Sequence, residues 1–244
     1  MSDDARGVSD VIGFVLVFSL IVGSISVMTV VGLDGLQDAR DSARVENAEL
    51  AFDVLANNIE DSQRRGAPGR ATEIRLGGGG LTVGEETVIR VTVGGTTTSR
   101  TIEPIVYEFE GTHIVYESTA VLRQESGGAV FVREPSFVLP AASTPNRTAI
   151  PLVATDVPDG RIGGRTTVLV RTTAISRSVI NDTDDATVTL EIETTEARAA
   201  AWDRYLEERL PGSACSYGGG ETVTCTFDTD RIVVSSTRID VTYE

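Results

Sequence analysis

The sequence contains no lysine: all 21 of its basic residues are arginines, against 36 aspartates and glutamates. The formal net charge is -15. This balance argues against nucleic acid as a partner, because phosphate binding needs clustered cations, and against docking on an anionic membrane surface. An excess of acidic residues without lysine is typical of proteins from salt-loving organisms. We therefore expect a halophile source; the alternative is an ordinary acidic surface domain.

Cysteine and histidine are also scarce. The two cysteines, Cys215 and Cys225, and the one histidine, His113, are too few for a typical zinc site. A Ser-His-Asp triad would have to use His113, which lies in an expected strand without a nucleophile elbow nearby. We predict no enzymatic activity, no cofactor and no metal. The cysteines flank a glycine-rich stretch, and outside the cell we expect them to form a disulfide; the alternative is two unrelated thiols.

A long uncharged segment begins near the N-terminus. No charged residue occurs from Val11 to Leu33. As a helix this segment would reach ~35 Å, enough to cross a ~30 Å hydrocarbon core. A cleaved secretory signal would have a basic start and a shorter apolar core. The sequence therefore predicts a retained membrane helix, and the cysteine pair favours an extracellular location for the C-terminal bulk.

The residues around Arg6 carry a family resemblance. Arg-Gly-Val-Ser-Asp-Val-Ile-Gly, residues 6–13, followed by an apolar helix, resembles the N-terminus of archaeal type IV pilins, especially haloarchaeal pilin-like proteins. The resemblance implies that a leader, residues 1–7, is removed by a prepilin peptidase between Gly7 and Val8. It also implies that a transmembrane helix, 8–33, serves as an anchor and packs with other pilin subunits. Asp10 replaces a proline of the pattern, which favours a minor pilin or pseudopilin. The alternative is an uncut, membrane-anchored extracellular binding module of a halophile.

An amphipathic helix is predicted over 34–65. Its apolar positions recur at intervals of three and four residues, and Gly66 follows its end. We expect this apolar stripe to pack on a β domain; a coiled-coil seam with other subunits is the alternative. The stripe consists of Val45, Ala48, Phe52, Leu55 and Ile59.

Short segments rich in β-branched residues dominate the rest of the chain. They predict an extracellular, mostly antiparallel β head over 66–244, in which 105–108 and 114–117 form neighbouring hairpin strands. Further short strands are expected at 166–171, 187–193 and 231–235. One late helix, about 197–210, should pack Trp202 onto the sheet. The predicted fold class is α+β, with a long N-terminal helix packed on the β domain.

Polar clusters in expected loops suggest two minor sites. Asn146 and Asn181 each begin an N-glycosylation acceptor triplet. Asp182, Asp184 and Asp185 lie together between two expected strands, where carboxylates could bind a hard cation. In so acidic a chain, solvated surface is the alternative for this cluster.

Overall fold

The structure is a computed structural model, and it describes residues 4–67, 69–140, 146–210, 212 and 214–244. The chain divides into two compact units, Met1–Arg44 and Val45–Glu244. Helix α1, Asp4–Arg65, contains residues of both units. The units are called unit 1 and unit 2 below.

Unit 1 consists of the first part of α1. Every residue from Ile12 to Thr29 is exposed, and this stretch is apolar and long enough to cross a membrane. The hydroxyls of Ser24, Ser26 and Thr29 donate hydrogen bonds to helix carbonyls at 2.8–2.9 Å. These three hydroxyls are thus satisfied within the helix, as an apolar environment requires. Unit 1 is compatible with single-pass membrane anchoring.

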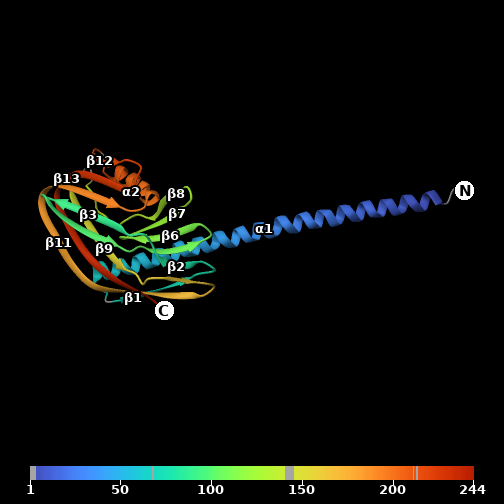
Figure 1. The fold of residues 1–244 in the computed structure, drawn as a ribbon, viewed down its shortest axis with the longest axis horizontal. Coiled ribbons are helices and arrows are strands. Elements are labelled where there is room, and N and C mark those ends of the chain that lie inside the picture. Colours follow the sequence, from blue (N-terminus) through green and yellow to red (C-terminus); the bar gives the residue numbers. More distant parts are fainter. Residues whose placement is uncertain (1–3, 68, 141–145, 211, 213) are drawn as a thin grey trace. The chain divides into compact units, whose positions relative to one another are not determined.

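Unit 2 contains the second part of α1, two β-sheets and one further helix (Figure 1). Sheet A has the strand order β12-β13-β11-β3-β4, with β1 also paired to β11 and β9 also paired to β13. Sheet B has the order β10-β2-β5-β6-β7-β8. The elements are β1 Gly69–Arg75, β2 Gly80–Val83, β3 Thr87–Val93, β4 Thr96–Ile102, β5 Ile105–Phe109, β6 Thr112–Glu117, β7 Ala120–Glu125, β8 Gly128–Arg133, β9 Arg147–Asp156, β10 Arg161–Gly163, β11 Thr167–Glu193, α2 Glu196–Arg209, β12 Ala214–Tyr217 and β13 Thr222–Tyr243.

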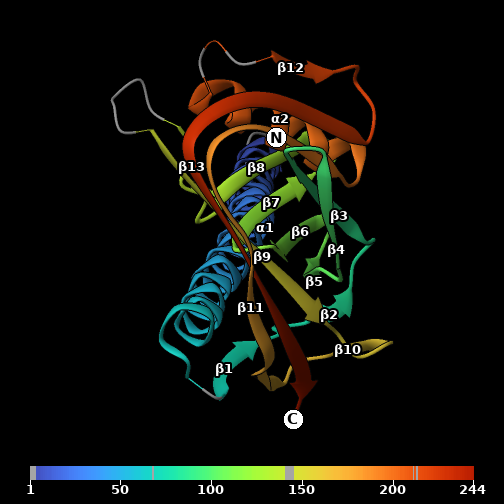
Figure 2. The same cartoon turned by 90° about the vertical axis from the view of Figure 1, so that its left-hand side faces the viewer.

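A long two-stranded ribbon forms the centre of sheet A. Strands β11 and β13 pair antiparallel along almost their whole lengths, from Val170 opposite Tyr243 to Glu193 opposite Thr222. Figure 2 shows this ribbon as a curved arch. The register shifts twice, near Ile175 and near Ile180, and such bulges bend strands. Among the strands that the structure describes, pairing is antiparallel except for β9, which runs parallel to β13.

The predicted amphipathic helix is confirmed as a core element of unit 2. Val45, Ala48, Phe52, Leu55 and Ile59 are all buried. They share one hydrophobic cluster with one face of sheet B and with the ends of β11 and β13. The helix ends where the glycine at position 66 adopts a φ of +77°, a left-handed conformation that glycine tolerates.

A second hydrophobic cluster lies against the other face of sheet B. It is built around α2, and Trp202 is fully buried there, as the sequence predicts. The Trp202 ring meets Phe131 edge-on at 5.1 Å between centroids and stacks on Phe137 at 5.7 Å.

The hairpin predicted from the two Ile-Val-Tyr-Glu segments is also confirmed, with Ile105 opposite Tyr116. The α+β fold class is therefore correct.

One expectation about the strands is wrong. The segments 166–171 and 187–193 were expected to be separate strands with a loop between them, but they belong to the single strand β11. Most of the intervening residues are exposed to solvent, among them the polar residues near Asp182, while β13 still pairs with them. Polarity alone therefore does not mark a loop here. The expected strand 231–235 likewise lies within the longer β13.

Candidate functional site

A group of charged and polar side chains lies buried between the sheets and α2. Its centre is Glu117, at the end of β6, which has no exposed surface. Arg198 of α2, only 3% exposed, donates a hydrogen bond from Nη1 to Glu117 Oε2. Trp202 Nε1 donates to Glu117 Oε1 at 2.6 Å, and Thr87 Oγ1 donates to Oε2 at 2.6 Å. We call Glu117, Arg198, Trp202 and Thr87 the Glu117 cluster.

The cluster joins segments that are distant in sequence. Glu117 comes from sheet B, Thr87 from sheet A and Arg198 from α2, so one carboxylate links both sheets to the helix. Burying a charge is costly unless it is paired and hydrogen-bonded, and both conditions are met here. No local sequence pattern predicts this arrangement. Glu117 is the last residue of a strand whose sequence indicates only a β-hairpin.

The turn that follows Glu117 has an unusual backbone. Ser118 and Thr119 have φ values of +40° and +77°, and both are buried. Residues other than glycine rarely adopt a positive φ, and this conformation is least favourable for a β-branched residue such as threonine. The backbone N–H of Ser136 donates to Thr119 Oγ1 at 3.0 Å and helps to hold the turn. A strained turn beside a buried charge pair is a reason to look for a site nearby.

A cleft of about 240 Å³ adjoins the Glu117 cluster. Three polar side chains, Glu108, His113 and Gln124, form a row across β5, β6 and β7, since each is opposite the next in register. Thr195, directly before α2, and Arg198 of α2 also line the cleft, and we therefore call it the α2 cleft. It is lined by Thr82, Val83, Gly84, Glu85, Val106, Glu108, His113, Val115, Gln124, Thr195 and Arg198.

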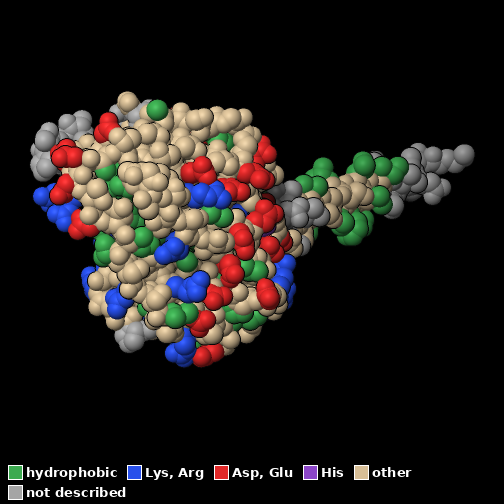
Figure 3. Space-filling model, turned by 60° about the vertical axis from the view of Figure 1, so that its left-hand side comes forward, with side chains coloured by type: hydrophobic (Ala, Val, Ile, Leu, Met, Phe, Trp, Pro, Cys, Tyr) green, Lys and Arg blue, Asp and Glu red, His purple; other side chains and the backbone are tan. Residues whose placement is uncertain are grey.

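Most charges of the α2 cleft are already paired. Glu108 Oε2 lies 2.8 Å from Arg161 Nη1, and Arg198 is paired with Glu117. Arg198 also donates from Nη2 to the backbone carbonyl of Glu85 at 2.9 Å. For the Glu85 carboxylate, the described residues supply no ion-pair partner. Figure 3 shows acidic side chains with interspersed arginines on one face of the molecule.

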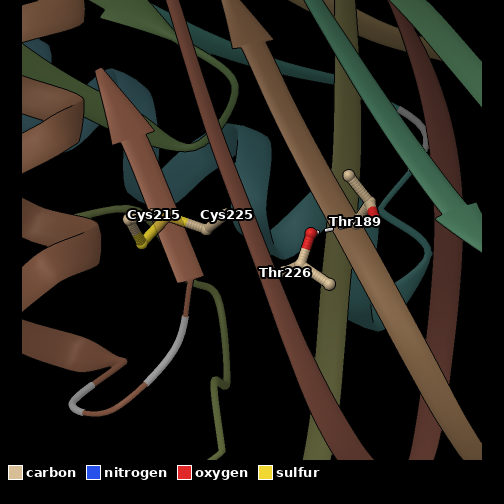
Figure 4. The surroundings of a disulfide bond; sticks show 4 residues. All are labelled: Thr189, Cys215, Cys225 and Thr226. Carbon is tan, nitrogen blue, oxygen red and sulfur yellow. Dashed lines mark hydrogen bonds between the residues drawn. A yellow bond between two sulfur atoms is a disulfide. The ribbon is translucent and has the colours of Figure 1, made fainter.

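The predicted disulfide is present in the structure. The Cys215 and Cys225 sulfurs are 2.01 Å apart, and the two residues are directly opposite each other on β12 and β13. Cys225 is fully buried against the α2 core. Figure 4 shows this bond on the edge strand β12, with the hydroxyls of Thr189 and Thr226 hydrogen-bonded nearby.

The aspartates proposed as a weak cation site lie in strand β11, so their expected loop location is wrong. Asp182 forms a two-pronged ion pair with Arg231, at 2.9 and 2.8 Å. Asp184 lies 3.9 Å from the same arginine, and Asp185 adopts a φ of +48°. Among the described residues, no group of three or more His, Cys, Asp or Glu side chains could hold a metal ion.

The two glycosylation triplets have different surroundings. Asn181 was expected in a loop but lies in β11, where its Oδ1 accepts a hydrogen bond from Thr183 at 2.6 Å. Asn146 directly precedes β9, and Thr148 of its triplet is buried and bonded to Thr229 at 2.9 Å. Glycosylation of either asparagine stays a prediction.

The predicted cleavage position lies within a helix. Gly7 and Val8 both belong to α1, which begins at Asp4. Cleavage between them stays a prediction too. A peptidase acting there would have to unwind the first turns of the helix, and glycine lowers the cost of an extended backbone.

Comparison with known proteins identifies a family without an assigned role. Residues 6–242 match DUF7289, a family of unknown function, and the chain therefore belongs to that family. The match covers the apolar part of α1, the amphipathic part of α1 and both sheets. Neither the curated proteins nor the solved structures contain a match to this chain.

Proposed function

We propose that the protein is a type IV pilin-like surface protein of a haloarchaeon, a minor pilin or pseudopilin without enzymatic activity. In this proposal, unit 1 crosses the cell membrane once and unit 2 is the extracellular head. A prepilin peptidase removes residues 1–7, and the apolar helix then anchors the head or packs with other pilin subunits.

The main observation behind the proposal is that the two parts of α1 have different surroundings. Its segment Ile12–Thr29 is apolar and exposed, whereas Phe52, Leu55 and Ile59 are fully buried in the core of unit 2. Exposed apolar residues over this length are costly in water and favourable in a bilayer or a helix bundle. A helix that is apolar at its start and integrated into a β head further on is the subunit plan that the proposal requires.

Two further observations support the proposal. The family match includes the apolar segment together with the β head, so the two parts occur as one family unit. The disulfide of the head suits an oxidising, extracellular environment. The surface also offers many carboxylates for hydration in concentrated salt, as the net charge of -15 indicates.

The proposal is tested by the mature N-terminus, determined by mass spectrometry on protein from a cell that contains a prepilin peptidase. We expect the chain to start at Val8. Gly7→Val should leave the leader attached, because a β-branched side chain beside the cut would obstruct the access of the peptidase to the peptide bond. Gly13→Val, the matched control within the apolar segment, should still be processed.

A native chain that starts at Met1 or Ser2 would contradict the cleavage step. It would instead support an uncut membrane-anchored binding module. Assembly is tested separately, by deleting the pilus assembly ATPase. Without this ATPase, we expect the head to be missing from surface filaments released by shear. The cleaved protein should remain in the membrane.

A further inference from the structure

We propose that the α2 cleft binds a small, neutral, polyhydroxylated ligand the size of one monosaccharide unit. The proposal concerns unit 2 alone and depends neither on leader cleavage nor on assembly. It follows from the size of the cleft, from the side chains that line it and from the way their charges are paired.

The size of the cleft suits a small ligand. Its volume of about 240 Å³ is below the range of roughly 300–1,000 Å³ that is usual for larger organic ligands. A single sugar ring or a similar polyol fits this volume. Val106 and Val115, adjacent to each other across β5 and β6, provide an apolar surface for the C–H groups of such a ring.

The polar row beside these valines has mixed hydrogen-bonding capacity. Glu108 offers carboxylate acceptors, Gln124 offers both an amide donor and a carbonyl acceptor, and His113 offers the two ring nitrogens of its imidazole. A ligand hydroxyl both donates and accepts. A row that contains both donors and acceptors therefore matches several neighbouring hydroxyls better than it matches a group that only accepts or only donates.

Charge pairing disfavours anions, and the arrangement of the carboxylates disfavours metal ions. Arg198 is held by Glu117, so it has no unpaired charge to offer to a phosphate or carboxylate, which would also face the carboxylates of Glu85 and Glu108. Glu108 is itself paired with Arg161. For a metal ion, the described residues contain no suitable group of three ligands. A neutral ligand avoids each of these conflicts.

Two hydrogen bonds hold the loop at Gly84 and Glu85, which forms one wall of the cleft. Arg198 holds the Glu85 carbonyl, and the Gly84 N–H donates to the Pro104 carbonyl at 2.8 Å. A Cβ atom at Gly84 would come within 2.7 Å of Val106 Cγ2, so a side chain there would press into the apolar floor. Preorganisation of this kind lowers the entropic cost of binding.

His113 makes the test direct, because it is the only histidine of the chain. The full-length protein, labelled with ¹⁵N-histidine, is prepared in phosphocholine micelles, whose head group contains no sugar. Glucose, galactose, mannose and N-acetylglucosamine are titrated separately, and the imidazole signals are recorded by NMR. At least one sugar should shift them saturably, while sodium acetate and ammonium chloride should not.

Gln124→Leu supplies the decisive variant, because it removes both hydrogen-bonding functions and keeps a similar volume. It should weaken binding of the active sugar about 3- to 10-fold, the effect of one hydrogen bond. Gln37→Leu makes the same change in unit 1 and should leave binding unaltered. Since Gln124 is half-exposed, the variant should fold, which the indole N–H signal of Trp202, the only tryptophan, verifies.

Three results would overturn the proposal. The first is the absence of any imidazole shift with all four sugars up to about 100 mM, a concentration at which even very weak binding is visible. The second is a saturable shift with acetate or ammonium alone. The third is equal affinity of the Gln124→Leu and Gln37→Leu proteins for the sugar that binds.

Discussion

At the scale of single residues, Glu117 carries a charge that folding removes from water. Its replacement in Glu117→Gln would leave Arg198, 3% exposed, without a counter-charge. Removing one partner of a buried ion pair typically costs about 3–5 kcal/mol, so we expect a loss of that size in the free energy of unfolding. Urea denaturation of the full-length protein in micelles, followed by Trp202 fluorescence, measures it.

The double variant Glu117→Gln/Arg198→Met tests the physical reason. It removes the uncompensated charge, and it should therefore lose less stability than Glu117→Gln alone. Glu134→Gln breaks an ion pair with Arg209 in which both side chains are about half exposed, so it should change stability by about 1 kcal/mol or less. A Glu117→Gln protein as stable as the Glu134→Gln protein would contradict this account.

Buried tyrosines predict a loss of stability in alkali. Burial raises the pKa of Tyr205 and of Tyr243 to about 12, and it also raises the pKa of Tyr116. An unfolded tyrosine has a pKa of about 10. The neutral form is therefore favoured by the folded state, and this stabilisation is complete below about pH 10 and is lost as the pH rises toward 12. Unfolding measured across this range should show the decline.

Tyr243→Phe isolates one contribution to this pH dependence. Within the described residues the Tyr243 hydroxyl is buried and finds no hydrogen-bond partner, so its removal should not reduce stability at pH 7. Above about pH 10 the variant should lose less stability than the native chain. An unchanged alkaline slope would show that Tyr243 ionises equally in both states.

At the scale of elements, the disulfide holds the four-residue strand β12 on the edge of sheet A. The chain-entropy relation for so short a loop gives about 2–3 kcal/mol of stabilisation. We expect a Cys215→Ser/Cys225→Ser protein to lose that amount in urea denaturation. Hydrogen exchange should rise mainly in β12, whereas the central strand β3 should stay protected.

Helix α1 presents two faces in unit 2, and they should respond differently to truncation. Phe52 is fully buried and Leu50 is 67% exposed, although they lie only two residues apart. Phe52→Ala should cost about 3–5 kcal/mol of unfolding free energy, whereas Leu50→Ala should change it by about 0.5 kcal/mol or less. Equal effects would show that the helix does not belong to the core.

The elements that could be predicted from the sequence are those with local signals. The spacing of Phe52, Leu55 and Ile59 identified the buried face of α1, and the repeated Ile-Val-Tyr-Glu segments identified the hairpin of β5 and β6. The middle of β11 was missed because its bulges interrupt the alternation and solvent surrounds most of its side chains. A strand of this kind is defined by its partner β13, which a single-sequence pattern does not reveal.

The candidate site was less predictable than the fold. Glu117 is followed by Arg198 81 residues later, and only the packing of α2 on sheet B brings them together. His113 was correctly expected on a strand, but its place in a cleft depends on the loop at Gly84–Glu85 and on α2. Sites assembled from three separate elements leave no motif in the sequence.

At the scale of the whole molecule, the boundary at Val45 is experimentally accessible. A fragment of residues 45–244 retains both hydrophobic clusters, and it should unfold cooperatively in urea without detergent. A fragment of residues 66–244 lacks the buried face of α1. It should show no cooperative transition, because the cluster beneath sheet B would be open to water. Equal cooperativity of the two fragments would contradict this role of α1.

The cluster around α1 also constrains the order in which the molecule can be made. It combines Phe52, near the start of the head, with Ile239 and Val241, which are synthesised almost 190 residues later, about the span between positions 52 and 241. Glu244 likewise exchanges two backbone hydrogen bonds with Leu169. Contacts between early and late segments cannot form until the late segment has emerged. If the head is exported during synthesis, the segment around Phe52 must therefore cross the membrane before its core is complete, and this core can close only after Ile239 and Val241 have crossed as well.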